Sequence, residues 1–167
     1  IPLPTRVFMA PMVGYNEPPL RRILRRFGSS LITTEMIKPE ALDPPSKSLL
    51  KELALGADEY PAAAQISACE PEPALKAAVT LRSLGFHVID INFGCPLKKE
   101  CSKGRGAAMM LEPRKVAVLI NTLVKELDCP ITVKMRSGWS DEEPTSPEIA
   151  RVAVDNGASA ICVHGRS

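Results

Sequence analysis

Cys95 lies between an apolar, β-branched run and a basic loop that contains several glycines. The run from Val88 to Asn92 alternates in polarity and predicts a buried strand, which Gly94 ends. A thiol can act as a proton donor or as a nucleophile when its surroundings control its ionisation. Cysteine is also a small apolar side chain that fills core space, with the lysines of the loop simply solvating a turn. The place of Cys95 at a strand end beside a cationic loop favours the chemical role.

Other candidate functional residues also follow apolar runs. They are Pro11, Glu35, Gln65, Asn92, Lys134, His164 and Arg166. A lysine between Val133 and Met135 in a strand is unusual for a solvated side chain, so Lys134 is a strong candidate. The carboxyl ends of parallel strands meet at one edge of a sheet, and we therefore expect these residues to gather there with Cys95.

The elements that would position these residues alternate along the chain. Short apolar runs predict six strands, at 7–10, 31–33, 62–66, 88–92, 131–135 and 160–164. Amphipathic stretches predict helices at 18–27, 46–55, 70–84, 113–127 and 147–156. In the first helix the arginines are expected to face solvent, opposite an apolar stripe. Strands that alternate with helices through short connections imply parallel β-α units with right-handed crossovers.

Alternation fits both a doubly wound sheet and a barrel. A doubly wound fold often carries a GxGxxG turn after its first strand, and this sequence has none there. Candidate residues at the ends of six different strands favour a TIM (β/α)8 barrel. A complete barrel has eight strands and typically about 250 residues. The 167 residues therefore predict one α/β domain, residues 1–167, truncated after about six strands, with strands seven and eight absent.

Composition indicates an ordinary soluble globular protein, with 45% hydrophobic and 24% charged residues. The net charge of +2 does not by itself indicate nucleic-acid binding, although a local arginine cluster at 21–26 could contact phosphates. Five cysteines without paired spacing favour a reducing, cytoplasmic setting, and the absence of a CxxC pair argues against zinc. No apolar run approaches the roughly 18 residues of a membrane span. We expect neither a metal nor a membrane.

The stretch around Cys95 resembles the active-site signature of the tRNA-dihydrouridine synthases. This signature is Asn92-Phe-Gly-Cys95-Pro96, followed by Lys98-Lys99 and then Lys103-Gly-Arg-Gly-Ala-Ala. Further similar motifs stand in that family's order. They are Ala10-Pro-Met-Val-Gly14, Thr34-Glu-Met36, Gln65-Ile66, Thr132-Val-Lys-Met-Arg136 with Ser137-Gly138, and Val163-His-Gly-Arg166. Six motifs in register extend the resemblance over nearly the whole chain.

The resemblance implies an FMN enzyme that reduces the C5–C6 double bond of uridine in tRNA, with NADPH most suitable to reduce the flavin. It also implies a C-terminal helical tRNA-binding domain, which this chain would lack. Cys95 is the expected acid, giving a proton to C5 after hydride reaches C6. The expected cofactor-binding residues are Ala10, Pro11, Met12, Gln65, Lys134 and His164. The expected substrate-binding residues are Asn92, Arg136, Arg166 and Glu35.

Two alternatives remain open. One is another FMN-dependent TIM-barrel oxidoreductase that acts on a free pyrimidine, and the other is a catalytically incomplete RNA-binding fragment. Cys101 departs from the family pattern and offers a competing thiol close to Cys95.

Overall fold

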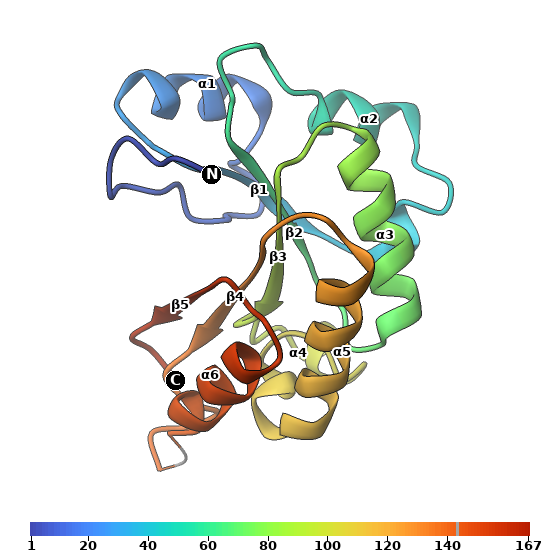
Figure 1. Ribbon diagram of the computed structural model, residues 1–167, viewed down its shortest axis with the longest axis vertical. Coiled ribbons are helices and arrows are strands. Elements are labelled where there is room, and N and C mark those ends of the chain that lie inside the picture. The colour runs from blue at the N-terminus through green and yellow to red at the C-terminus, as the bar shows by residue number, and fades with distance from the viewer. Residues whose placement is uncertain (143) are drawn as a thin grey trace.

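The computed structural model describes residues 1–142 and 144–167. Its centre is a five-stranded parallel sheet in the order β1-β2-β3-β4-β5 (Figure 1). The strands are β1 (Ile32–Ile37), β2 (Ala62–Ile66), β3 (Val88–Phe93), β4 (Ile131–Arg136) and β5 (Ala160–His164). Each strand pairs with its predecessor in the chain and the order never reverses. A doubly wound sheet reverses its order at a switch point, so this topology is instead compatible with part of a barrel.

Helices connect the strands. They are α1 (Pro18–Arg26), α2 (Lys47–Leu53), α3 (Pro71–Ser83), α4 (Lys98–Cys101), α5 (Pro113–Glu126) and α6 (Ser146–Asp155), with 3-10 turns η1 (Pro39–Ala41) and η2 (Gly106–Leu111). Proline occupies one of the first positions of α1, α3, α5 and α6, where its missing N–H costs no helical hydrogen bond. The five long helices predicted from the sequence are all present. The short α4 and η2 were not predicted.

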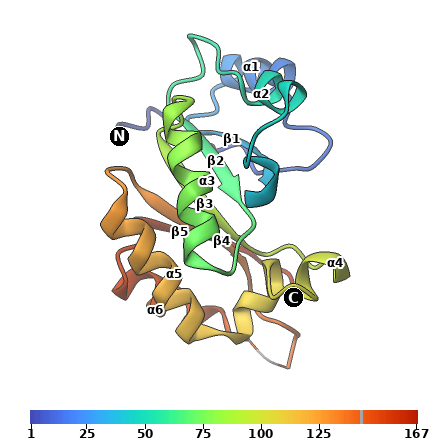
Figure 2. The same cartoon turned by 90° about the vertical axis from the view of Figure 1, so that its right-hand side faces the viewer.

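The core lies between the sheet and helices α3, α5 and α6, which cover one face side by side (Figure 2). Alternate residues of β3 and β4, such as Ile91 and Val133, point into this core together with the buried stripe of α5. The residues between them face the opposite side of the sheet. On that face the strands carry polar side chains, and the candidate site is built from these.

The strand predicted at 7–10 does not form. Phe8 makes only an isolated parallel bridge to Leu31, with the Met9 N–H donating to the Leu31 carbonyl at 3.0 Å. Phe8 remains 52% exposed. The segment lies beyond β1 at the edge of the sheet and pairs on one side only, and Pro11 follows at once without an N–H to extend the pairing.

The face assigned to the arginines of α1 was wrong for Arg21. Arg21 is 1% exposed, whereas Ile23 and Phe27 of the expected apolar stripe are 49% and 83% exposed. The Arg21 guanidinium donates to Glu59 Oε1 at 2.7 Å and to the carbonyls of Asn16, Glu52 and Ala54 at 3.2, 2.8 and 2.8 Å. An arginine can be buried when its donors are satisfied in this way, and it holds α1 against the end of α2.

Candidate functional site at the carboxyl ends of the strands

Five polar side chains share the face of the sheet opposite the long helices. Gln65 of β2 is in register with Asp90 of β3, Asp90 with Thr132 of β4, and Asn92 with Lys134. Parallel register places their side chains in adjacent rows on one face. Gln65 is fully buried, and Asp90 and Asn92 are 8% and 9% exposed. The chain thus builds a polar layer where a sheet interior would ordinarily be apolar.

Hydrogen bonds join this layer into one network. Thr132 Oγ1 donates to Asp90 Oδ1 at 2.5 Å, and Gln65 Nε2 donates to Asp90 Oδ2 at 2.7 Å. Asn92 Nδ2 donates to Gln65 Oε1 at 2.8 Å. Burial raises the pKa of Asp90, while the hydrogen bonds from Thr132 and Gln65 and the charge of Lys134 oppose that rise.

The network ends at the turn that carries Cys95. Asn92 Oδ1 accepts the backbone N–H of Gly94 at 3.0 Å and that of Cys95 at 2.8 Å. The Cys95 carbonyl accepts the Ala107 N–H at 2.9 Å. The peptide groups on both sides of Cys95 are therefore fixed, while its side chain is only partly buried. A fixed backbone with an accessible thiol suits a group that must meet a substrate in one orientation.

A second set of contacts ties the Cys95 loop to the exits of β1 and β2. Glu100 of α4 is 2% exposed, and its carboxylate accepts Lys38 Nζ and Ser67 Oγ at 2.9 Å each. Burial of Glu100 opposes its ionisation, but Lys38 and Ser67 outweigh that effect and hold its pKa below the ordinary value. A more exposed ion pair joins Arg105 to Glu40.

The Arg105–Glu40 pair predicts an acid-sensitive contribution to stability. The hydrogen bond from Arg105 lowers the pKa of Glu40 from 4.5 to about 2. The pKa of Glu40 is lower in the folded protein than in the unfolded chain. The pair therefore stabilises the fold above about pH 4.5, and this stabilisation is lost as the pH falls towards about 2. We expect Glu40→Gln to lower the free energy of unfolding in urea by at most about 1 kcal/mol near neutral pH, since the Glu40 side chain is 59% exposed and solvent screens its charge. The difference in unfolding free energy between Glu40→Gln and the unaltered protein should shrink as the pH is lowered from neutral towards about 2. An equal difference at neutral and at acidic pH would contradict the assignment. Glu126→Gln, which removes a different carboxylate, is the control.

The structure contains a cavity of about 190 Å³ on the polar side of the sheet. Among the residues that line it are Ala10, Pro11, Asp90, Thr132 and Lys134. Met12 follows in the loop and is 42% exposed. The chain therefore brings Lys134 and the Ala10-Pro11 segment to one cavity, which also reaches residues in the first half of the strands, such as Ala63 and Ala160. Gln65 has no exposed surface and does not line the cavity. It contacts the cavity only indirectly, through its hydrogen bond to Asp90.

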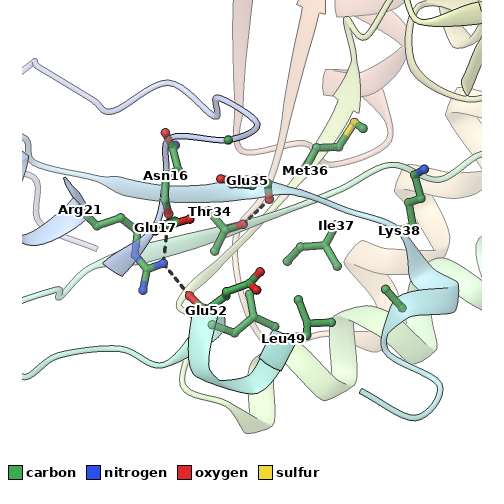
Figure 3. A pocket seen from close by; sticks show the side chains of 13 residues that line it. Asn16, Glu17, Arg21, Thr34, Glu35, Met36, Ile37, Lys38, Leu49 and Glu52 are labelled. Carbon is green, nitrogen blue, oxygen red and sulfur yellow. Dashed lines mark hydrogen bonds between the residues drawn. The ribbon is translucent and has the colours of Figure 1, made fainter. Parts of the chain in front are cut away.

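Glu35 borders a different cavity. This one measures about 320 Å³ and lies between β1, α1 and α2, with Asn16, Arg21, Glu35, Lys38 and Glu52 among its lining residues (Figure 3). Glu35 is therefore not brought to the cavity that Lys134 lines. Lys38 lines this second cavity and also pairs with Glu100 of α4.

Arg136 supports the Cys95 turn from the next strand. Its Nε donates to the Gly94 carbonyl at 2.7 Å, and another guanidinium nitrogen donates to the Ser167 carbonyl. His164 and Arg166 lie exposed at the exit of β5, with His164 in register with Arg136. Lys98 and Lys99 are exposed on α4, and Cys101 Sγ donates to the Cys95 carbonyl at 3.5 Å.

Four residues of the site were not predicted from the sequence: Asp90, Thr132, Ser67 and Glu100. A signal existed for Asp90, because it stands two positions before Asn92 in an apolar strand and must share its face. No signal identified Glu100, whose two partners come from distant strand exits. Among the described residues, no group of three or more His, Cys, Asp or Glu is placed to hold a metal ion. None of the described helices is long and apolar enough to cross a membrane.

The topology and the site define a parallel α/β protein whose candidate site runs along the polar face of its sheet to the turn after β3. Comparison with known proteins identifies the family. The family model described as Dihydrouridine synthase (Dus) matches residues 8–167, so the chain belongs to the dihydrouridine synthase family.

Curated relatives agree with this assignment. A "Probable tRNA-dihydrouridine synthase" of Rickettsia conorii is 36% identical over 168 residues, covering 100% of this chain and 51% of the relative. A "tRNA-dihydrouridine synthase B" of Pseudomonas aeruginosa is 36% identical over 166 residues, covering 99% and 50%. A protein of the same name from Pasteurella multocida is 35% identical over 165 residues, covering 99% and 50%. The chain spans about half the length of the curated relatives it matches.

Proposed function

We propose that this chain forms the FMN-binding part of an enzyme that reduces uridine to 5,6-dihydrouridine in tRNA. The observation that carries the proposal is the Cys95 turn, fixed through Asn92 and Ala107 at the edge of a polar face that also carries Lys134. Family membership supports the same reaction, because the relatives are named as tRNA-dihydrouridine synthases. We place the reaction in the cytoplasm, where tRNA is modified.

The proposed architecture is the first part of a TIM (β/α)8 barrel. Five parallel strands in sequential order support it, since each β-α unit of a barrel adds one strand beside the last. In this proposal the polar face of the sheet is the barrel interior. The remaining strands and a C-terminal tRNA-binding domain would come from the further length that the relatives have.

The described residues fit FMN by the chemistry of their donors. Lys134 brings a partly exposed ammonium group to the cavity that Ala10 and Pro11 also line. Flavin carries its polar groups on one edge of a flat apolar ring system. A flavin site therefore needs polar donors for that edge and apolar contacts for the ring. We assign Lys134 to stabilising negative charge on the ring, with Ala10, Pro11 and Met12 as its apolar contacts. Gln65 would hold Asn92 in place beneath them, and His164 would meet the cofactor phosphate.

FMN, when bound and reduced by NADPH, supplies the hydride that uridine receives at C6. The protein must then deliver a proton to C5, and we assign that step to the Cys95 thiol. A thiol carries a proton that it can give to developing negative charge, so it can serve as an acid. Asn92 fixes the Cys95 peptide, and Arg136 fixes the preceding carbonyl. We assign Arg166, exposed after β5, and Glu35, which borders the separate cavity beside α1 and α2, to the tRNA.

Cys95→Ala tests this proposal. In the purified flavin-loaded protein we expect flavin reduction by NADPH to be unchanged, because the thiol takes no part in it. Formation of dihydrouridine in unmodified tRNA should slow by 10²-fold or more, the usual size of a lost general acid. Cys101→Ala is the matched control, since it removes the neighbouring thiol and should leave turnover within about twofold.

The outcomes separate the alternatives. Undiminished turnover of Cys95→Ala on tRNA would refute its role as the acid. Turnover of free uracil or uridine without RNA would favour a different FMN-dependent oxidoreductase. A protein that retains tRNA but cannot be loaded with FMN, showing no flavin absorption, would leave an RNA-binding function.

A further inference from the structure

Asp90 stands outside the roles assigned above, although it occupies the centre of the polar face. Its two carboxylate oxygens accept from two different strands, Oδ1 from Thr132 and Oδ2 from Gln65. It lines the same cavity as Lys134 and is 8% exposed. A buried carboxyl is costly unless its acceptors are satisfied. Packing alone therefore does not explain why a carboxylate lies buried at this position of the sheet.

The direction of the hydrogen bonds supplies a reason. A backbone N–H can only donate, so the turn at Gly94 and Cys95 requires the oxygen of the Asn92 amide. The Asn92 nitrogen must then face Gln65, and it donates to Gln65 Oε1. This leaves the Gln65 nitrogen facing the other way, where only an acceptor satisfies it. Asp90 Oδ2 is that acceptor, at 2.7 Å.

The side-chain amides of Asn92 and Gln65 thus form a directional chain of hydrogen bonds. It begins at the backbone N–H donors of the Cys95 turn and ends at the Asp90 carboxylate, the acceptor. If the acceptor is removed, Gln65 is left with a buried N–H without a partner, and turning its amide over would bring two nitrogens together at Asn92. Either outcome disturbs the oxygen that holds the Cys95 turn. The cost of an unsatisfied buried donor exceeds the value of an ordinary hydrogen bond.

We propose that Asp90 is a positioning residue for Cys95, which it orients through the amides of Gln65 and Asn92. The role of this relay in catalysis rests on the proposed function, since it orients the thiol that we assign as the acid. Its structural part does not depend on bound FMN. Thr132 is the anchor of the second carboxylate oxygen and lies outside the relay.

The test compares Asp90→Leu, which removes the acceptor, with Asp90→Asn, which keeps one carbonyl oxygen for Gln65. In Asp90→Asn the new amide nitrogen faces Thr132, whose hydroxyl can turn and accept it. Thr132→Val is the matched control, because it removes a hydrogen bond to the same carboxylate without touching the relay. Gln65→Met interrupts the relay at its next link and replaces Asp90→Leu as the test if that variant does not fold.

The first readout is hydrogen exchange of the Gly94 and Cys95 backbone amides in FMN-free protein, measured by NMR. We expect exchange to be about tenfold faster in Asp90→Leu and Gln65→Met, and within about twofold of the unaltered protein in Asp90→Asn and Thr132→Val. The amides of Leu119 and Ile120 in α5 should not change, which separates the relay from a general loss of stability. Unchanged exchange at Gly94 and Cys95 in a folded Asp90→Leu or Gln65→Met would overturn the proposal.

The second readout is the dissociation constant for FMN, measured by flavin fluorescence. Asp90→Leu should weaken FMN about tenfold, and Asp90→Asn, which keeps the acceptor for Gln65, should restore the affinity to within about twofold. If the unaltered protein binds no FMN while the amides respond as expected, the proposed function fails and the relay stands. If FMN binds and the amides do not respond, the relay fails and the proposed function stands.

Discussion

Gly106→Ala is expected to displace the Cys95 peptide and to destabilise the folded protein by about 2 kcal/mol or more. Gly106 has a φ of +59°, a conformation in which a side chain costs about 1–2 kcal/mol. A Cβ on Gly106 would also lie 2.4 Å from the Cys95 carbonyl oxygen and 3.0 Å from Cys95 Cβ. The backbone at Cys95 would have to move, because that oxygen is not at the end of a flexible side chain.

Gly104→Ala is the matched control for this experiment. Gly104 has a φ of +73°, but a Cβ there would meet only Cys69 Sγ, at 3.8 Å. It should therefore show the backbone strain alone, about 1–2 kcal/mol. Both variants are compared by urea unfolding and by the rate at which iodoacetamide modifies Cys95 in protein whose other cysteines are serine. Equal stability and equal modification rates would show that Gly106 is not needed for the close approach to Cys95.

Arg21→Met is expected to lower the free energy of unfolding by about 3–5 kcal/mol, the usual effect of removing one partner of a buried ion pair. The change leaves Glu59, 1% exposed, without the guanidinium that lies 2.7 Å from its Oε1. It also removes the donors to the carbonyls of Glu52 and Ala54. The measurement is urea unfolding followed by circular dichroism.

The neighbouring arginine provides the control. Arg22 Nε lies 3.9 Å from the other Glu59 oxygen, but its side chain is 51% exposed. Arg22→Met should therefore cost less than about 1 kcal/mol. A similar loss of stability in both variants would mean that the buried contacts of Arg21 are not the cause.

The sequence was a good guide where the pattern depends on local periodicity. Five of the six predicted strands and all five long helices are present, because their apolar spacing also determines which face is buried. The segment at 7–10 has the same β-branched and apolar character, but no second neighbour pairs with it. Strand formation depends on partners that a single run of sequence does not contain.

The candidate site was predictable in its positions and not in its connections. Register on parallel strands brings Asn92 beside Lys134, as expected from residues at strand ends. The burial of Arg21 and Glu100 follows from partners 38 and 33 residues away, Glu59 and Ser67, and no periodicity in the chain encodes such pairs. Gln65 was predicted to face a cofactor, and the structure commits its amide at both ends to other side chains.

The sheet order has a consequence for how the chain is made. Every strand hydrogen-bonds to the strand that precedes it in the chain, so during synthesis each new strand finds its partner already outside the ribosome. Contacts between successive units keep loop closure short, which favours fast docking of each unit. The relay itself joins β2 and β3, but β4 supplies Thr132 to Asp90 and Arg136 to the Gly94 carbonyl, so these supports are in place only after β4 has joined the sheet. Assembly order thus makes the Cys95 turn a late product of folding.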